Sequence, residues 1–459
     1  MEKKRRKKLG KKGWCSELFS PPPPPVRFGL KLSFLIALIA ALAFAGCNQS
    51  TSPGSAPETG ASLPALSGNI TITNGANPVT SAYTGTQLTA AYSGTETVTY
   101  QWNKGGTAIT GATNTTYTPG DAGSYTVTVS ATGYQSKTSA AVTITAVYLA
   151  GFYEDDSANQ IACYWKDGVK TNLGTAGSNS YATAIAVSGS SVYVAGNYAD
   201  GGTDKACYWK IDGTTVTQID LPALVTGKDS YTNGIAVSGG AVYVAGFYWD
   251  NPNEKACYWK DGVPTSLHTG TTSSTSGIAV SGGAVYVAGS YTDGTDKACY
   301  WQIDGTTPSK TDLPTTETNP STTGIAVSGG AVYVAGIYMA GDYRACYWTG
   351  GEQTKLHATS YSSTSGIAVS GGAVYVAGSY YDGSKYIACY WTGGVPTNLT
   401  TTETDPSTTG IAVSGGSVYV TGFYTAESGD HITCYWKDGA KTNIAPVGST
   451  VTGIAVVLE

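Results

Sequence analysis

The sequence predicts an all-β chain in which a small β-sandwich is followed by a seven-bladed β-propeller closed by the C-terminal strand. Three observations predict this fold. The composition is turn-rich, with 60 Gly and 33 Tyr among 459 residues and only 12% charged residues, as in chains of short strands and tight turns. A strand-like phrase recurs seven times at a nearly constant period. That series also begins and ends with incomplete copies.

Residues 1–46 have the pattern of a signal peptide. They carry ten of the chain's 26 Lys and Arg residues, and residues 32–45 form an apolar stretch without a charge. That stretch is shorter than the about twenty residues that a membrane-spanning helix needs, which favours a signal peptide. We interpret Val26, translated from a GTG codon, as the true start, because the residues before it are untypical of a signal.

The segment Phe44–Cys47, FAGC, resembles the lipobox of bacterial lipoproteins, in which the Cys is acylated and becomes the mature N-terminus. The resemblance implies lipidation at Cys47 and a membrane as partner, although Phe44 stands where Leu is usual. A plain secretory signal with a chance Cys is the alternative. Residues 47–64 are rich in Ser, Pro and Gly, and we expect them to be a flexible tether.

The charge is divided unevenly along the chain. Outside residues 1–46 there are 16 Lys and Arg against 29 Asp and Glu, a net charge of −13. Nucleic-acid binding depends on a basic surface that neutralises phosphates. We therefore expect no nucleic-acid partner.

Residues 65–146 contain short alternating runs such as QLTAAY and SYTVTVS, separated by Gly, Asn and Pro. This spacing predicts a β-sandwich. Trp102 in YQWN and Tyr125 in DAGSY resemble the strand-C Trp and the tyrosine corner of bacterial immunoglobulin-like domains. The resemblance implies that fold and a core position for both aromatics. Apolar residues stand where the disulfide of the family would be.

Residues 147–459 consist of units with three anchors, IAV, VYVAG.Y and ACYW. Tight SGG, D-G and G-G turns separate the strands that these anchors predict. Each unit therefore predicts four antiparallel strands, and the period of 42 to 50 residues matches a propeller blade. The period is measured between successive repeat cysteines, which are Cys163, Cys207, Cys257, Cys299, Cys346, Cys389 and Cys434.

The incomplete copies predict how the ring closes. The first unit starts at Val147 without a preceding IAV, and the chain ends on an IAV with no VYV after it. Residues 453–459 should therefore be the inner strand of the first of seven blades. The phrase GIAVSGGAVYVAGSY at 277–291 resembles the bacterial seven-bladed propeller repeat and, more loosely, NHL repeats. That resemblance implies a fold and no particular chemistry.

The seven repeat cysteines are expected to be buried free thiols. Facing sheets lie roughly 10 Å apart, whereas a disulfide needs Cα atoms within about 7 Å. The same spacing argues against a metal site built from them. The loops DGGTD (200–204) and DGTD (293–296) have carboxylates at a spacing that suits Ca²⁺, but Asp-Gly is also the ordinary hairpin signal. We expect no metal and no cofactor.

Catalytic motifs are scarce. His268, His357 and His431 lie near strand ends or loops without a paired nucleophile, and neither GxSxG nor the sialidase-type SxDxGxTW box occurs. We therefore predict that the chain is not an enzyme, with a polysaccharide-acting hydrolase or lyase as the alternative. The Trp residues of ACYW are expected to fill the space between blades rather than to stack on carbohydrate.

Two of the four connections in each unit are short and uniform, whereas the other two vary in length and composition. Alternate turns of an antiparallel sheet fall at the same end, so both variable sets should share one face. A diversified face on a rigid scaffold is typical of binding proteins. The candidate ligand-binding residues on that face are Tyr181, Tyr231, Trp249, Asp250, Tyr343 and Tyr361. Covering the blade ends is their alternative role.

Together these features favour a monomeric lipoprotein of the bacterial cell envelope, anchored in the outer membrane or at the cell surface. Its propeller is expected to bind a protein or glycan without catalysis. A purely structural envelope role is a further alternative.

Cys47→Ala should abolish lipid anchoring, because this Cys would carry the acyl chains. The variant should move from the detergent phase to the aqueous phase in a detergent-partition experiment. Ser52→Ala changes a small residue of the predicted tether instead and should leave partitioning unchanged. A Cys47→Ala protein that still enters the detergent phase would contradict the lipobox interpretation.

Overall fold

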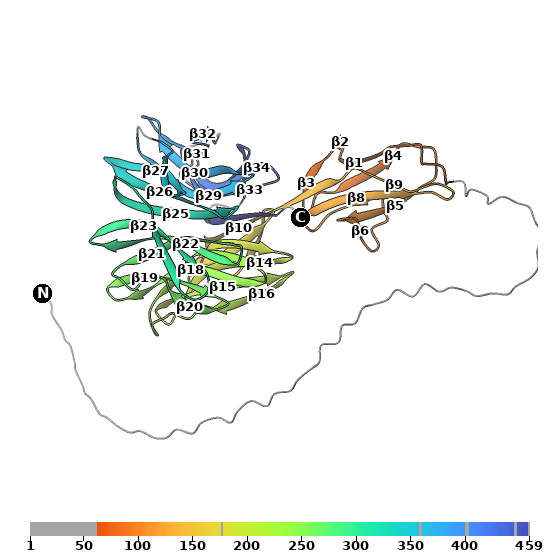
Figure 1. Ribbon diagram of the computed structural model, residues 1–459. Coiled ribbons are helices and arrows are strands. Elements are labelled where there is room, and N and C mark those ends of the chain that lie inside the picture. Colours follow the sequence, from red (N-terminus) through yellow and green to blue (C-terminus); the bar gives the residue numbers. More distant parts are fainter. Residues whose placement is uncertain (1–61, 176–177, 358–359, 400–403, 445–447, 458–459) are drawn as a thin grey trace, which may run out of the picture. The chain divides into compact units, whose positions relative to one another are not determined.

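The computed structural model describes residues 62–459 except 176–177, 358–359, 400–403, 445–447 and 458–459. These residues form 37 strands, and no helix is present among them (Figure 1). The all-β prediction is therefore confirmed. The predicted signal peptide, Cys47 and the tether up to residue 61 lie outside the described residues.

The first strands after residue 62 form two sheets. One has the order β2-β1-β4-β7, and the other joins β6, β5 and β8 to the long strand β10, with β3 and β9 also attached. The strands are β1 (Ile70–Asn74), β2 (Asn77–Pro78), β3 (Ser81–Tyr83), β4 (Leu88–Tyr92), β5 (Thr99–Lys104), β6 (Thr107–Ala108), β7 (Thr116–Tyr117), β8 (Gly123–Ser130), β9 (Lys137–Thr138) and β10 (Val142–Glu154). We call residues 65–146 the sandwich.

The core of the sandwich is built around two aromatic residues. Trp102 is fully buried, and its indole nitrogen donates to the carbonyl of Asn114 at 3.0 Å. Tyr125 is also buried, and its hydroxyl donates to the carbonyl of Asp121 at 3.0 Å, which is the hydrogen bond of a tyrosine corner. Leu88 packs in the same core. Apolar packing therefore joins the two sheets.

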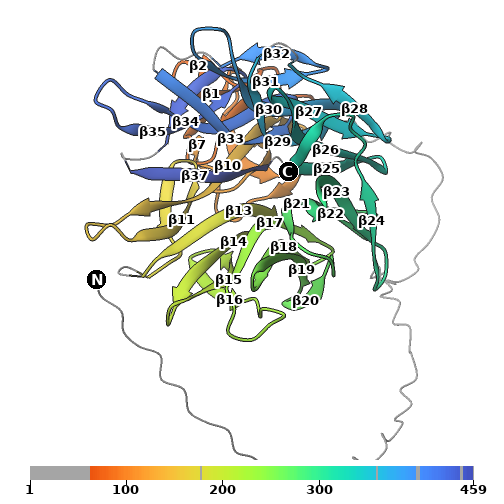
Figure 2. The same ribbon diagram turned by 90° about the vertical axis from the view of Figure 1, so that its left-hand side faces the viewer.

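The rest of the chain forms a β-propeller of four-stranded sheets, which Figure 2 shows arranged radially. We number the sheets that follow blade 1 in the chain as blades 2 to 7; blade 1 itself combines strands from both ends of the propeller and is described below. They are β13 (Ser180–Ser188) to β16 (Thr215–Asp220), β17 (Ser230–Ser238) to β20 (Val263–Ser266), β21 (Ser273–Ser281) to β24 (Pro308–Asp312), β25 (Thr318–Ser328) to β28 (Glu352–Lys355), β29 (Ser362–Ser370) to β32 (Val395–Asn398) and β33 (Thr404–Ser414) to β36 (Ala440–Asn443).

Within these blades the second and third strands lie in the middle of the sheet. They are β14 (Ser191–Asp200) and β15 (Thr203–Asp212), β18 (Ala241–Asp250) and β19 (Asn253–Lys260), β22 (Ala284–Asp293) and β23 (Thr295–Ile303), β26 (Ala331–Ala340) and β27 (Asp342–Thr349), β30 (Ala373–Tyr381) and β31 (Tyr386–Thr392), and β34 (Ser417–Thr425) and β35 (His431–Lys437). Each runs antiparallel to its neighbours in sequence order.

Blade 1 combines the two ends of the propeller. Strand β10 leaves the sandwich, where Val142 is paired with Tyr125, and continues into the blade beside β11 (Gln160–Lys166) and β12 (Val169–Asn172). The C-terminal strand β37 (Ser449–Val457) pairs antiparallel with the other edge of β10, with Leu149 opposite Ile454. The last strand of the chain is thus the inner strand of the first blade.

The Trp and Cys of each ACYW strand fill the space between adjacent blades. Trp259 and Cys257 of blade 3, for example, are fully buried and pack in one cluster with Tyr193 and Ala195 of blade 2. Equivalent clusters join every neighbouring pair, including blades 7 and 1, where Trp165 packs with Tyr419. The expected role of these Trp residues as inter-blade core is therefore what the structure shows.

The second strand can lie this close to its neighbours only because it carries a glycine in VAG. At Gly196 an added Cβ would lie 2.1 Å from the carbonyl oxygen of Tyr181 and 2.5 Å from the ring of Trp209. No side chain fits at such distances. The repeated Gly is therefore a packing requirement of the blade.

A belt of side-chain hydrogen bonds joins the inner strands of successive blades. In each pair, the side chain two residues before the IAV anchor of one blade bonds to the side chain three residues before the IAV anchor of the next blade. The pairs are Thr183 with Thr232 (2.7 Å), Asn233 with Thr275 (3.1 Å), Ser276 with Thr322 (2.7 Å), Thr323 with Thr364 (2.7 Å) and Ser365 with Thr408 (2.8 Å).

Where the ring closes, blades 1 and 2 lack the partner Thr, and the bonding residue of the preceding blade uses another acceptor. Blade 1 has Val451 where the other partner is a Thr, and Thr409 of blade 7 bonds instead to Thr421 at 3.1 Å. Thr421 stands where the other blades have Ala. Blade 2 has Ala182 at the partner position, and Thr452 donates to its backbone carbonyl at 2.8 Å.

Deleting residues 453–459 should lower the melting temperature by more than about 5 °C, because it removes part of β37 and exposes apolar surface of blades 1 and 7. Thermal unfolding followed by circular dichroism measures this. A control that lacks only residues 458–459 should melt like the intact chain. A change of one or two degrees on removing the longer segment would contradict a closing role for β37.

Candidate binding face of the propeller

The two sets of variable connections meet at one end of the blades. The amide of Asp204, near the start of β15 beside the β14–β15 hairpin loop, donates to Asp229 in the connection to the next blade at 2.9 Å. In the same way Thr272 of a connection between blades donates to Asn253 at 3.0 Å. We call the ends of these hairpins and connections the variable-loop face. Their joint position agrees with the sequence expectation.

The opposite end of the blades carries the uniform turns, and we call it the uniform-turn face. Gly239 and Gly240, with φ of 58° and 82°, show the positive φ that such two-residue turns need. Strand β10 enters blade 1 from the sandwich at this end. There the Lys166 ammonium group donates to the carbonyl of Gly120 at 3.0 Å and lies 3.5 Å from Asp121. The sandwich thus contacts the uniform-turn face.

Two of the predicted residues cover the blade ends near the inner strands. Tyr181 packs edge-on against Phe152, with ring centroids 5.5 Å apart. Tyr231 stacks on Phe247 at 5.1 Å, and its hydroxyl donates to Asp204 at 2.7 Å. Burial and the neighbouring carboxylates raise the pKa of Tyr231. Both rings are half-buried, so they serve at least the covering role that was the alternative.

Trp249 and Asp250 lie at the tip of β18. The amide of Trp249 donates to the carbonyl of Asp229 at 3.0 Å, its side chain is half-buried, and Asp250 is exposed. Tyr343 and Tyr361 lie elsewhere on the face, with ring centroids 6.3 Å apart and planes at 89°. Of the six predicted residues, the structure therefore brings these two tyrosines into direct contact, while the others are spread over blades 2 and 3.

Two further tyrosines, Tyr381 and Tyr386, belong to the same aromatic cluster and were not predicted from the sequence. Tyr386 packs edge-on against Tyr361 at 5.5 Å and against Tyr381 at 5.4 Å. With Tyr343 they form a four-tyrosine cluster across blades 5 and 6, in which Tyr343 is 39% and Tyr386 40% exposed. The signal was available, because blade 6 has YYDGSKY where other blades have one aromatic residue or two.

A hollow of about 410 Å³ opens on the variable-loop face between blades 4 and 5. Ser274 and Ser290 face each other at its inner side, with hydroxyl oxygens 3.3 Å apart. Asp296, Asn319 and Tyr343 also line it. Its volume falls within the about 300–1,000 Å³ typical of small-molecule sites.

A second hollow of about 620 Å³ continues the first toward the outer strands. The two share Thr292, Asp296, Asn319 and Pro320. In the second hollow Glu317 is paired with Lys355 at 2.6 Å, and this partner holds the pKa of the Glu317 carboxyl below its usual range. We call the two hollows together the blade 4–5 seam.

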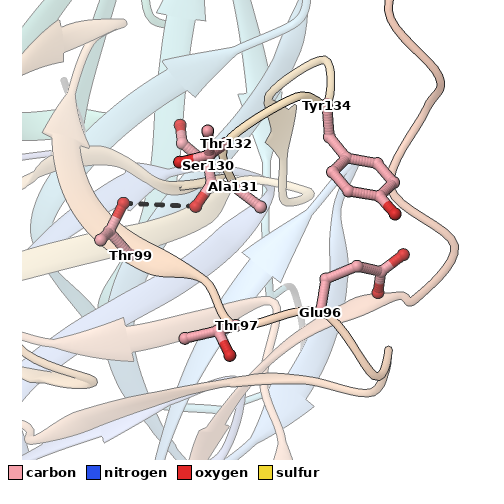
Figure 3. Close-up of a pocket in the computed structure, with 7 residues that line it drawn as sticks. All are labelled: Glu96, Thr97, Thr99, Ser130, Ala131, Thr132 and Tyr134. Atoms are coloured by element: carbon pink, nitrogen blue, oxygen red, sulfur yellow. Dashed lines mark hydrogen bonds between the residues drawn. The ribbon is translucent and has the colours of Figure 1, made fainter.

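A depression of about 750 Å³ lies on the sandwich, between Glu96 and Tyr134 (Figure 3). The Glu96 carboxylate accepts a hydrogen bond from the Tyr92 hydroxyl at 2.7 Å, which helps to lower its pKa to about 2. Such a carboxyl is ionised at neutral pH and is a poor general acid. Hydroxyls and a carboxylate form most of its polar lining.

The Asp-Gly loops considered for calcium hold carboxylates with protein partners. Asp293 lies 3.5 Å from the Lys297 ammonium group, and Asp200 is paired with Lys205. Asp204 accepts the Tyr231 hydrogen bond described above. Within the part of the chain that the structure describes, no group of three His, Cys, Asp or Glu residues is placed to bind a metal ion.

The histidines lie against aromatic rings. His268 is 4.9 Å from the ring of Tyr291, and His357 is 4.7 Å from that of Tyr380 and 3.1 Å from the Ser360 hydroxyl. Burial lowers the pKa of both imidazoles, so they are neutral at physiological pH.

The described residues include no helix able to span a bilayer.

All seven repeat cysteines are buried and free of disulfides. Burial raises the pKa of the Cys163 and Cys346 thiols to about 12, and it also raises the pKa of four further thiols, those of Cys207, Cys257, Cys299 and Cys389. Thiolates are the reactive form of cysteine. These residues therefore act as small apolar core residues.

No protein-family model matches the chain, and no curated protein matches it in sequence. Similar solved structures include a quinonprotein alcohol dehydrogenase-like protein from Bacteroides thetaiotaomicron, with 13% identity, a TM-score of 0.42 and coverage of 84% of this chain and 98% of that one. The propeller domain of the Trilobed protease from Pyrococcus furiosus shows 11% identity, a TM-score of 0.43 and coverage of 65% and 94%. At such identities the likeness is one of fold.

A third similar structure corrects one prediction. A puromycin-hydrolysing peptidase from Mycobacterium tuberculosis shows 11% identity and a TM-score of 0.49, with coverage of 65% of this chain and 51% of that one. Because proteins with this fold include enzymes, the prediction that the chain is not an enzyme is wrong as an exclusion. Scarce motifs do not exclude catalysis, since function resides in sites rather than folds.

The repeat thiols should resist alkylation at pH 8 in the folded protein, because all seven are buried and the raised pKa keeps thiols such as that of Cys163 protonated. Iodoacetamide labelling followed by mass spectrometry should find the seven sites unmodified in buffer. In denaturant without reductant all seven should react. Rapid labelling of the folded chain, or fewer than seven reactive sites after unfolding, would contradict this assignment.

Proposed function

We propose that the chain is a lipid-anchored protein of the bacterial cell envelope whose variable-loop face binds a glycan or protein ligand. In this proposal residues 1–46 are the signal peptide, Cys47 is lipidated, and the sandwich is an immunoglobulin-like spacer. The propeller would be a seven-bladed ring closed by β37 at the outer membrane or cell surface.

One observation carries the proposal. As far as the structure describes them, the connections that differ between blades belong to the variable-loop face, and that face also holds the four-tyrosine cluster and the blade 4–5 seam. The uniform turns lie at the other end, where the sandwich makes contacts through Lys166. Tyr and Trp supply large contact areas at low entropic cost and are common in binding hot spots.

The direction of the chain supports a spacer role for the sandwich. Ala65 near its start is bridged to Gln135, at the end of β8 remote from the propeller, whereas β10 leaves the sandwich beside the other end of β8. A tether before residue 65 would thus enter the sandwich at the end away from blade 1. Strand β10 enters blade 1 at the uniform-turn face, so the variable-loop face is the end of the propeller farther from that entry point.

Trp249→Ala and Tyr361→Ala should each weaken ligand binding by roughly 1–2 kcal/mol if these rings are hot spots. Ligands are first found by a glycan array and a surface pulldown with the full chain, and affinities are then measured by calorimetry. Asp304→Ala, an exposed turn residue of the opposite face, is the control and should have no effect. A ligand sensitive to Asp304→Ala and insensitive to the loop variants would contradict the proposal. If a bound polysaccharide is cleaved and releases product, the variable-loop face catalyses a reaction as well as binding a ligand.

A further inference from the structure

We infer that the blade 4–5 seam is the binding site for a neutral carbohydrate chain, with Tyr343 as the stacking platform and Asp296 and Asn319 as hydrogen-bonding residues for sugar hydroxyls. This inference rests on the proposed function of the variable-loop face. It names one site on that face and one chemical class of ligand.

The inner hollow of the seam lies beside two facing positions that are both aromatic in blade 3 and both Ser in blade 4. In blade 3 the facing residues Tyr231 and Phe247 stack and fill the blade end. In blade 4 the residues at the same places are Ser274 and Ser290. The inner hollow of the seam lies at these small side chains. The small pair leaves space that the aromatic pair of blade 3 fills. Blade 6 has the same small pair, Ser363 and Ser379, so the seam is defined by this pair together with Asn319 and Tyr343 of blade 5.

The lining of the inner hollow suits a polyhydroxylated ligand. Most of its side chains end in hydroxyl, amide or carboxylate groups, which can donate to or accept from sugar hydroxyls. Asp296 is exposed, and its Oδ1 atom is held by the Thr292 hydroxyl at 2.9 Å. Such an oriented carboxylate is a strong acceptor for neighbouring hydroxyls.

An aromatic surface borders the same hollow. Tyr343 lines it, is 39% exposed and is held by the edge of Tyr361. The electron-rich face of an aromatic ring attracts the polarised C–H bonds on the face of a sugar ring. Tyr386 extends this surface over blade 6. A ligand with both an apolar face and a hydroxylated rim matches this combination.

The shape and charge narrow the ligand further. Two hollows that share four residues make an elongated site, which fits a chain of sugars better than a single ring. Lys297 lines the seam and lies 3.5 Å from the Asp293 carboxylate. Glu317, which also lines it, is paired with the Lys355 ammonium group, so both ammonium groups are already neutralised by carboxylates. An anionic glycan would meet the field of a chain with a net charge of −13 outside residues 1–46.

The decisive variant fills the inner hollow with a larger side chain and removes only one polar group, the Ser290 hydroxyl. Ser290→Phe places at blade 4 the residue that blade 3 has at the equivalent position. It should fold normally and weaken binding at least about tenfold by occluding the hollow. Tyr343→Ala and Asp296→Asn should each weaken binding by about tenfold.

Two variants serve as matched controls. Asp204→Asn makes the same change at the corresponding TDK position of blade 2, where Tyr231 covers the blade end. Tyr134→Ala removes a half-buried tyrosine from the sandwich. Both should leave binding unchanged. Melting temperatures of all five variants exclude losses caused by unfolding.

The experiment measures binding of the full chain to gluco-, manno-, galacto- and xylo-oligosaccharides, with sialylated and sulfated oligosaccharides for comparison. The inference is supported if a neutral oligosaccharide binds and the three seam variants weaken it while the controls do not. Selective binding of acidic oligosaccharides, or binding that the seam variants leave intact, overturns it. A protein ligand sensitive to Trp249→Ala, with no oligosaccharide bound, overturns this inference and leaves the proposed function standing. No ligand of either class overturns both.

Discussion

The structure depends on the packing of each Trp-bearing third strand against the strands of the preceding blade. A four-stranded sheet with two apolar faces is not stable alone, and it buries both faces only between two neighbours. Trp259 and Cys257 therefore meet Tyr193 and Ala195 of the blade before them. Because every blade makes the same contact, the same residue types must recur in every unit. That requirement explains the repeated phrase more simply than any shared catalytic role.

The same constraint decides where the units are free to differ. Residues between blades must keep their volumes, and the glycine of VAG must keep its lack of a side chain, as at Gly196. The inner strands must also keep their hydrogen bonds, and where Val451 replaces a Thr the partner moves to Thr421. Only the strand ends and connections remain free. Sequence differences there open the hollow at Ser274 and Ser290.

Sequence periodicity predicted the strands of the propeller, the burial of the cysteines and the pairing of the last strand with β10, because each follows from residues repeated along the chain. The site was harder to predict. Tyr343 and Tyr361 were singled out as variable aromatics, but the four-tyrosine cluster also depends on how the loops of blade 6 bring Tyr386 against Tyr361. The blade 4–5 seam was missed, because a hollow results from what several distant side chains leave unfilled.

The repeat therefore offers an internal comparison that a single-copy fold would lack. Blades 2 and 4 both carry a TDK loop, but Tyr231 of blade 3 covers the first while the second borders an open hollow. The carboxylate of Asp204 is engaged by that Tyr hydroxyl, and the carboxylate of Asp296 is instead oriented toward the seam's rim by Thr292. Both hairpins join the second and third strands of their blades, and that of blade 2 is one glycine longer. The two carboxylates therefore differ in their surroundings because of the neighbouring blade, so the side chains of two adjacent blades together decide whether such a carboxylate is covered.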